Sequence, residues 1–338
     1  MASVRGPVAP PDNILIVTID EASLREFALK GIHWPWPGSV YGQLVTKASQ
    51  EGARAVVFAS FFGGEGPSTQ EFASSIRSSQ CPVILETVTT PSLDPEWTIL
   101  PAESLIAAGA RTGFSHLQPD MDSVVRRTRL FAQGAPSLVA QTYSLVVGSP
   151  LEVDQLPMAG YPDSDPEILI NFHGGGRHTR TTSYGVALDK PAPYFHNKII
   201  LVGRFPRIEV GKGFATPFSS DPLEGLPTEY TATLSLMTKV EVQANALSTL
   251  LRENFIYTLG PLTQHAAALL MGFLVSFVTF AARRGSLALP VVSGGIVVYL
   301  IVVATLFDRF SQWVRPAWPL CVVLLSLVLT LIYRKWRA

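Results

Sequence analysis

The sequence contains little charge. Asp, Glu, Lys and Arg together make up 15% of its 338 residues, whereas a soluble domain usually carries about 25%. Apolar residues reach 47%, which excludes an intrinsically disordered chain. A chain this poor in charge is not expected to be wholly water-soluble.

Cysteine is also scarce. Cys81 and Cys321 are the only two, and two cysteines cannot form a disulfide framework. Cys321 lies in an apolar run, so a bridge to Cys81 is not expected. The sequence therefore predicts two unpaired, unreactive thiols.

The charges that are present are unevenly distributed. From Leu259 to Ala338 seven basic residues stand against one acidic residue, Asp308, which gives this tail a formal charge of +6. The preceding part has a formal charge of −6, and the two charges cancel to the formal net charge of zero. Nucleic-acid binding needs a clustered cationic face, and an acidic domain followed by a basic, apolar tail predicts no nucleic-acid partner.

Three stretches near the C-terminus contain no charged residue: Asn254–Ala282, Gly285–Phe307 and Pro316–Tyr333. About 20 helical residues cross a hydrocarbon layer of ~30 Å, so the first two are long enough and the third, with 18 residues, lies at the short end. Buried helices of a soluble core would show polar faces at helical spacing, which these stretches lack. The sequence predicts a transmembrane domain, 258–338, with three helices in the lipid bilayer at about 259–282, 286–307 and 316–333.

The basic residues orient these helices. Cytoplasmic loops are enriched in Lys and Arg, so Arg283–Arg284 and Arg334–Arg337 are expected in the cytoplasm, although the opposite loop also carries Arg309 and Arg315. Residues 1–257 then form an extracytoplasmic domain.

An export signal is not visible in the sequence. Met1–Pro7 lack the apolar core of a signal peptide, yet an outer domain of this size needs one. Either an N-terminal anchor has been lost or cleaved from the sequence, or the topology is inverted. We favour a missing anchor or a misplaced start.

Residues 1–257 have the pattern of an α/β domain. Nearly continuous apolar runs are typical of strands that are buried on both faces. The predicted strands are Asn13–Asp20, Ala53–Ala59, Cys81–Glu86, Ile168–Phe172 and Lys198–Gly203. The predicted helices are Glu21–Leu29, Val40–Glu51, Ala73–Ser79 and Thr231–Glu253, the last running into the membrane. This alternation predicts a largely parallel or mixed sheet flanked by helices.

Two segments rich in turn-forming residues predict loops. They are Thr87–Ala102 and Ser149–Pro166. The second is a candidate boundary between two halves of the same domain.

Several segments together resemble the type-2 CHASE domain, the cyclase- and histidine-kinase-associated sensory extracellular domain of bacterial receptors. They occur in the family's order and cover most of residues 13–251. The segments are Ile16–Leu24, Trp34–Pro37, Gly52–Phe58, Gly113, Asp120–Arg127, Ile170–Gly174, Phe195–Gly203, Thr216–Pro217 and Val240–Leu247. The three predicted spans match as well, because such receptors typically have three transmembrane helices after this domain. The resemblance implies a protein of the bacterial inner membrane with a periplasmic N-terminal domain and a cytoplasmic C-terminus.

The sequence also departs from this family. Gly38 stands where the family usually has a basic residue, Ala59 where it has an acidic one, and Gln243 where it has His. The N-terminal anchor and the intracellular effector are not part of the sequence, since it stops directly after the third predicted span. The resemblance therefore implies a sensor-like domain without an output of its own.

No catalytic set emerges from the motifs. His173–Gly176 resembles the oxyanion-hole loop of an esterase, but that chemistry needs a Gly-x-Ser-x-Gly nucleophile elbow, which the sequence lacks. The histidines show no helix-spaced pair typical of a metal site. We predict no enzymatic activity, no metal and no cofactor.

Ligands of α/β sheets bind outside the carboxyl ends of the strands. The candidates for a ligand pocket are Asp20, Trp34, Ser60, Asp122, Arg126 and Arg204. Several have an alternative, purely structural role. Asp20 is equally suited to cap the following helix, Trp34 is suited to close the core beside Trp36, and Arg126 to pair with a carboxylate.

Small residues mark faces for close packing between the predicted spans. These are Gly272 and Ser276 in the first span and Gly294 and Gly295 in the second. His265, near the outer end of the first span, is either a functional polar group inside the membrane or a side chain that reaches the interface.

Two functional hypotheses follow. The first is a non-catalytic, membrane-anchored sensory module that binds a small molecule or a protein outside and acts through a separate effector. The alternative is a structural or accessory subunit of a larger membrane complex (respiratory, photosynthetic or secretory) that docks on partner subunits. The family resemblance favours the first, whereas the absent effector, the substituted polar positions and the small-residue faces favour the second.

Overall fold

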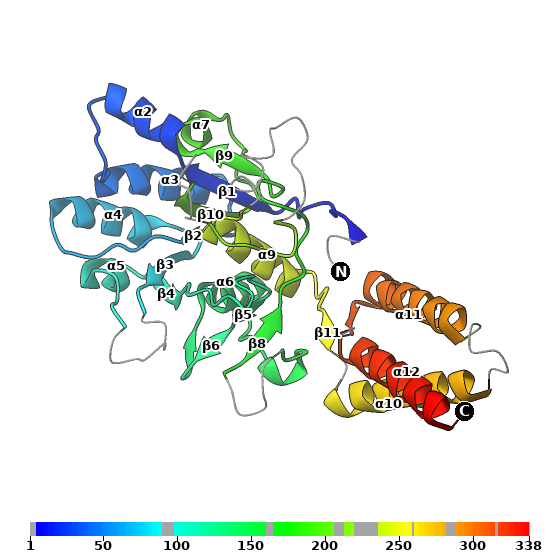
Figure 1. The fold of residues 1–338 in the computed structure, drawn as a ribbon. Helices are drawn as coiled ribbons and strands as arrows, with labels where there is room; N and C mark the ends of the chain where they lie inside the picture. Colours follow the sequence, from blue (N-terminus) through cyan, green and yellow to red (C-terminus); the bar gives the residue numbers. More distant parts are fainter. Residues whose placement is uncertain are drawn as a thin grey trace. The chain divides into compact units, whose positions relative to one another are not determined.

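The computed structural model describes residues 5–89, 98–159, 165–205, 213–219, 236–258, 260–281, 288–314 and 317–337. Figure 1 labels its helices and strands. They form two compact units, one of Gly6–Phe255 and one that contains Ile256–Ala338. The candidate boundary at Ser149–Pro166 does not divide the first unit.

A six-stranded sheet forms the centre of the first unit. In spatial order its strands are β4 (Arg111–Phe114), β3 (Val83–Thr87), β2 (Ala55–Phe58), β10 (Ile199–Arg204), β1 (Ile14–Ile19) and β9 (Thr181–Ser183). Every neighbouring pair is parallel. All carboxyl ends therefore lie along the same edge of the sheet.

The inner strands are apolar throughout because both faces of the sheet are covered. All residues of β1 and β2 are buried. Leu15 and Val17 pack in one core with Val56 and Val202. The alternating direction of side chains along a strand sends their neighbours, such as Ile16, to the opposite face.

Two helical layers cover the sheet (Figure 1). One layer holds α2 (Glu21–Leu29), α3 (Gly38–Gln50), α4 (Pro67–Ser78), α5 (Glu103–Ala107) and α7 (Tyr184–Asp189). The other holds α6 (Leu138–Val147) and α9 (Lys239–Leu251). The prediction of an α/β fold with a mainly parallel sheet flanked by helices is confirmed.

Helix α9 lies almost entirely inside the protein. Every residue from Val240 to Leu250 is buried, because α9 packs on β1, β10 and α6. The Glu241 carboxylate fixes its first turn by accepting hydrogen bonds from the backbone N–H groups of Thr238 (2.8 Å) and Arg177. Burial raises the pKa of Glu241, and these hydrogen bonds offset only part of that rise.

Some predicted boundaries differ from the structure. Helix α4 begins at Pro67, six residues before its predicted start, with proline in the first turn, where the missing N–H is no loss. Helix α9 begins at Lys239 rather than Thr231, and residues 231–235 lie outside the described part of the chain.

The predicted strand Ile168–Phe172 is also shorter and lies outside the main sheet. Strand β8 (Glu167–Leu169) pairs antiparallel with β5 (Arg127–Arg129). Short elements that complete the unit are the hairpin of β6 (Phe131–Ala132) and β7 (Ala135–Pro136) and the 3₁₀ helix η2 (Val153–Gln155).

Two glycines allow the second helical layer to approach the sheet closely. A Cβ atom on Gly113 of β4 would lie 2.7 Å from the backbone nitrogen of Leu138, where α6 begins. A Cβ atom on Gly203 of β10 would lie 2.7 Å from the Cβ atom of Val240 in α9. Neither distance is compatible with a side chain unless the helix shifts.

The second unit consists of three apolar helices and two short strands. They are α10 (Pro261–Ala281), α11 (Ala288–Phe310), α12 (Ala317–Arg337), β11 (Tyr257–Thr258) and β12 (Gln312–Trp313). Helices α10 and α11 are long and apolar enough to span a membrane, over Leu262–Ala281 and Val292–Phe310. Most of their apolar side chains are exposed rather than packed in a core, which is expected of a surface that another apolar medium or partner covers.

The prediction of three spans is not confirmed, because within the described residues two helices qualify as candidate membrane spans. The apolar part of α12 covers Ala317–Tyr333, which lies at the lower end of the length that a span of the hydrocarbon layer requires. The residues that predicted the orientation, Arg283, Arg284 and Arg315, lie outside the described part of the chain.

The close approach of α6 to β4 yields a stability prediction. We expect Gly113→Ala to lower the free energy of unfolding by about 1–3 kcal/mol, because its methyl group meets backbone atoms that cannot rotate away. Gly66→Ala is the matched control, since a Cβ atom on Gly66 would have no heavy atom within 4 Å. Thermal unfolding of the full chain in detergent, followed by circular dichroism, separates the two. Equal melting temperatures for both variants would contradict this packing.

Candidate functional site

A cleft opens at the carboxyl edge of the main sheet, where β2, β3 and β10 end. Its volume is about 720 Å³, a size typical of small-molecule sites. The polar and aromatic side chains that matter most for its chemistry are Trp34, Trp36, Ser60, Glu86, Arg204 and Lys239.

An exposed tryptophan and an arginine form one wall of this cleft. The Arg204 guanidinium lies 5.6 Å from the centre of the Trp34 ring, which is within the range of a cation–π interaction. Trp34 is 43% exposed, whereas Trp36 is only 5% exposed and packs on Phe27 at 4.5 Å between ring centres. Trp36 therefore closes the core, whereas Trp34 faces the cleft. Each tryptophan takes one of the two roles, core packing or ligand contact, that the sequence suggested for Trp34.

An ion pair joins the sheet to helix α9 at the back of the cleft. The Lys239 ammonium contacts the Glu86 carboxylate, which also accepts a hydrogen bond from the Ser115 hydroxyl. Glu86 is 8% exposed, and a buried polar group is stabilised by such hydrogen-bonding partners. The first residue of α9 is therefore held to the end of β3 by charge.

The N-termini of three helices also border the cleft. Gly38 of α3, Ser68 and Thr69 of α4, and Lys239 and Val240 of α9 are lining residues. Each helix N-terminus carries a partial positive charge from its unpaired backbone N–H groups. The edge of the sheet is thus an electropositive place in which to bind a ligand.

The structure brings three of the six predicted pocket residues together. Trp34, Ser60 and Arg204 all line the cleft. Asp20 lies at a separate hollow beside Thr181. Asp122 and Arg126 belong to neither.

Asp20 caps helix α2. Its carboxylate accepts hydrogen bonds from the Ser23 backbone N–H (2.9 Å), the Ser23 hydroxyl (2.6 Å) and the Ser183 hydroxyl (2.8 Å). Burial raises the pKa of Asp20, but the hydrogen bonds from Ser23, Ser183 and Thr18 outweigh it, so the net pKa is below the ordinary value of 3.8. These contacts give Asp20 the structural role that was the alternative to ligand binding, namely that of a helix cap.

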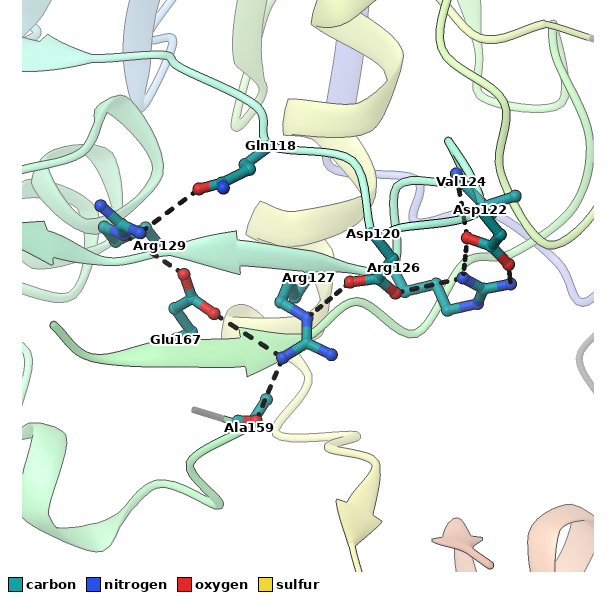
Figure 2. Close-up of polar contacts among 9 residues, drawn as sticks. All are labelled: Gln118, Asp120, Asp122, Val124, Arg126, Arg127, Arg129, Ala159 and Glu167. Atoms are coloured by element: carbon teal, nitrogen blue, oxygen red, sulfur yellow. Dashed lines mark hydrogen bonds and ion pairs between the residues drawn. The ribbon is translucent and has the colours of Figure 1, made fainter. Parts of the chain in front are cut away.

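Asp122 and Arg126 pair with each other (Figure 2). The Arg126 guanidinium donates to both carboxylate oxygens of Asp122, at 2.8 and 2.6 Å, and to Asp120 at 3.1 Å. The hydrogen bond from Arg126 lowers the pKa of Asp122 to about 2. With their charges mutually satisfied, these side chains act as a local brace.

This brace continues along strand β5 (Figure 2). The Arg127 Nε atom lies 3.0 Å from Asp120. The Glu167 carboxylate of β8 then contacts both Arg127 (3.8 Å) and Arg129 (3.2 Å). The network fastens the loop that contains Asp120 to the β5–β8 pair, and we assign it a structural role.

Two of the three positions at which the sequence departs from the CHASE pattern, Gly38 and Ala59, line the cleft. The third, Gln243, is 2% exposed and donates from Nε2 to the backbone oxygen of Ser115 at 3.4 Å. The Ser115 hydroxyl in turn donates to Glu86. A Cβ atom on Gly38 would lie 1.9 Å from the Ser68 backbone oxygen, so α3 and α4 leave no space for a side chain there.

Glu86 and Lys239 were not among the predicted pocket residues. Glu86 ends a predicted strand, so the rule that selected Ser60 and Arg204 was sufficient to select it too. Lys239 was not recognisable, because the helix that it begins was expected to start eight residues earlier.

The remaining polar candidates of the sequence are a set of histidines and a set of cysteines. Within the described ranges no group of three or more His, Cys, Asp or Glu side chains is placed to hold a metal ion. His173 is buried in a turn, where its backbone N–H donates to Asn245 Oδ1 at 2.9 Å. The free thiol of Cys81 is buried, which raises its pKa, and that of Cys321 is exposed.

In the second unit the small residues occupy two different environments. A Cβ atom on Gly272 would lie 2.8 Å from Ser326 Oγ and from Val322 Cγ1, so α10 and α12 pack closely there. Ser276 is half-buried. Gly294 and Gly295 of α11 are exposed, with no described atom within 4 Å of the position of a Cβ.

His265 contacts an aromatic ring at the end of its helix. Its imidazole lies edge-on to Trp318 of α12, with 5.8 Å between ring centres. This contact gives the side chain a packing role within the second unit.

Comparison with known proteins identifies one family. A model of the CHASE2 domain matches residues 1–281. No curated protein and no solved structure matches the chain.

The capping role of Asp20 leads to a pH-dependent prediction. We expect Asp20→Ala to lower the free energy of unfolding by about 1 kcal/mol at pH 7, whereas Asp20→Asn retains most of the cap. Because the folded pKa of Asp20 is lowered, its ionised form stabilises the fold above the ordinary value of 3.8 and loses this effect as the pH falls below it. Melting temperatures measured from pH 7 down to pH 3 test this, and an Ala variant as stable as the wild type at pH 7 would refute it.

Proposed function

Because the chain belongs to the CHASE2 domain family, we propose that it is a non-catalytic, membrane-anchored sensory protein whose outer domain binds a ligand in the cleft and acts on a separate effector. CHASE2 domains are extracellular sensory domains, and the chain continues into apolar helices after this domain. In this proposal residues 1–257 are periplasmic, the protein resides in the bacterial inner membrane, and the C-terminus is cytoplasmic.

The observation that carries the proposal is the position of helix α9. Lys239, its first residue, lines the cleft. The buried body of the helix crosses under β1 and β10, and the chain reaches Pro261, the first residue of α10, ten residues after α9 ends at Leu251. Helix α9 therefore leads from the candidate site to the segment 252–260, which continues along the chain into the apolar helices.

A ligand would act through the ion pair at the start of α9. Binding that competes for Lys239 weakens its contact with Glu86 and with it the attachment of α9 to the end of β3. Because close-packed interiors respond by discrete shifts rather than gradual deformation, α9 is suited to two positions. A ligand that binds more tightly to one of these positions shifts the equilibrium toward it. The shift in free energy equals the difference between the binding free energies of the ligand for the two positions.

Helix α12 is included in this proposal as a third span. Its apolar part, Ala317–Tyr333, is short for a span. It therefore requires local thinning of the bilayer or flanking side chains that extend to the interface, and either adjustment costs little free energy. The three spans then run out-to-in, in-to-out and out-to-in, and place the basic C-terminal residues in the cytoplasm, as the positive-inside rule expects.

The alternative function is a structural or accessory subunit of a membrane complex. The observation that favours it is the face of α11, where Gly294 and Gly295 are exposed beside apolar residues such as Val298 (61% exposed). Small residues allow a partner helix to approach closely. Copurification with a membrane protein at fixed stoichiometry, lost in Gly295→Leu but not in Arg204→Gln, would favour this alternative.

The proposed topology makes a labelling prediction. In a Cys321→Ser background, we expect the exposed variant Glu21→Cys to react with a membrane-impermeant maleimide in spheroplasts, because α2 lies in the outer domain. Trp336→Cys, at the other end of the chain, should react only after the membrane is permeabilised. If only Trp336→Cys were labelled in intact spheroplasts, the protein would have the opposite orientation in the membrane.

The proposed transmission through α9 makes a second prediction. We expect Lys239→Met to accelerate amide hydrogen exchange in the first turns of α9 and at the start of α10, because the variant removes the cation that holds α9 to Glu86. Arg25→Gln, an exposed change on α2, is the matched control. Exchange that accelerates only in the loops around the cleft would contradict transmission through the helix.

A further inference from the structure

We infer that the cleft binds a small, singly charged anion that carries a planar aromatic ring, such as an aromatic carboxylate. This inference rests on the proposed sensory function, because it names the ligand class of the same cleft. It follows from the charge and the aromatic surface that the cleft presents.

The charge of the lining favours a monoanion. Of the described residues that border the cleft, three carry charge, namely Glu86, Lys239 and Arg204. Glu86 and Lys239 pair with each other, whereas no carboxylate in the described part of the chain forms an ion pair with Arg204. Among the described residues one positive charge is thus uncompensated, which suits a carboxylate and is too little for a polyphosphate.

Backbone groups add to this preference. Lys239 and Val240 are the first two residues of α9, a helix of 13 residues. The N–H groups of a first helical turn have no partner within the helix, and they favour a negative charge nearby. A carboxylate between Arg204 and the start of α9 would contact both.

The walls favour a flat ring. Trp34 and Phe61 are 43% and 38% exposed, which is high for large aromatic side chains. Below them Tyr41, Phe62 and Phe72 form an aromatic floor, with 4.9 Å between the ring centres of Tyr41 and Phe62 and 5.2 Å between those of Phe62 and Phe72. Edge-to-face and offset contacts with such rings are a favourable environment for another aromatic ring.

The contact between Arg204 and Trp34 combines both preferences. The guanidinium is already held at 5.6 Å from the centre of the exposed indole. A planar ring placed against Trp34 therefore brings an attached carboxylate within reach of Arg204, whose fork of N–H groups matches the two oxygens of a carboxylate.

The inference is tested by binding to the full chain in detergent, with benzoate, 1-naphthoate and indole-3-carboxylate as probes. We expect at least one of them to raise the melting temperature in a concentration-dependent manner. Benzamide, which lacks the charge, and cyclohexanecarboxylate, which lacks the aromatic ring, should bind more weakly than benzoate when measured by titration calorimetry.

Variants assign the binding to the cleft. Arg204→Gln should weaken the affinity for the bound probe by about 10- to 100-fold, the range for a hydrogen bond to a charged group. Trp34→Leu should weaken it by about three- to tenfold. Arg25→Gln should leave it unchanged. Circular dichroism and melting temperatures without probe establish that each variant is folded.

Each remaining outcome decides a separate question. If none of the aromatic carboxylates binds, or if one binds equally to wild type and Arg204→Gln, the ligand class is wrong. The sensory proposal would still survive if a neutral compound stabilised the chain and changed hydrogen exchange in α9. If an aromatic carboxylate binds through Arg204 but leaves exchange in α9 unchanged, the ligand class stands and the proposed sensory function fails.

Discussion

The parallel direction of all six strands is the constraint on which the rest of the structure depends. Parallel strands end on the same edge, and the helix that follows a strand starts near that edge. The polar residues that close β2, β3 and β10 are therefore brought together with the positive ends of α3 and α4. Helix α9 joins them at the same place. The cleft is thus a direct product of strand direction, and the side chains at its edge decide only what it binds.

The parts of this fold that the sequence predicted are those with strong, local signals. The four inner strands are continuous apolar runs because helices cover both faces of the sheet, and such runs are recognisable without the structure. Strands β4 and β9 were not predicted, because each is short and its side chains are only partly buried. Helix α6 was missed as well, although its capping Ser137 and closing Gly148 are typical of helix ends.

The candidate site was predictable to a similar degree. The strand-end rule selected Ser60 and Arg204, and both line the cleft. The same rule selected Asp20, whose carboxylate turned out to be used by local hydrogen bonds, because a polar residue between a strand and a helix serves equally well as a helix cap. Asp122 and Arg126 are four residues apart in sequence and pair with each other. Long-range pairs such as Glu86 and Lys239, 153 residues apart, cannot be inferred from spacing in one sequence.

Gly38 has a consequence for how this protein can vary. It allows α3 to start against the Ser68 carbonyl of α4, and the same two helices supply Tyr41 and Phe72 to the aromatic floor. Any larger residue at position 38 would spread the two helices and enlarge the cavity between their first turns. Substitution at this position would therefore alter the size of the cavity and the packing of the helices in one step. With glycine here the cavity stays narrow on this side, so its shape can change without moving a helix only through side chains of the other walls, such as Trp34 and Arg204.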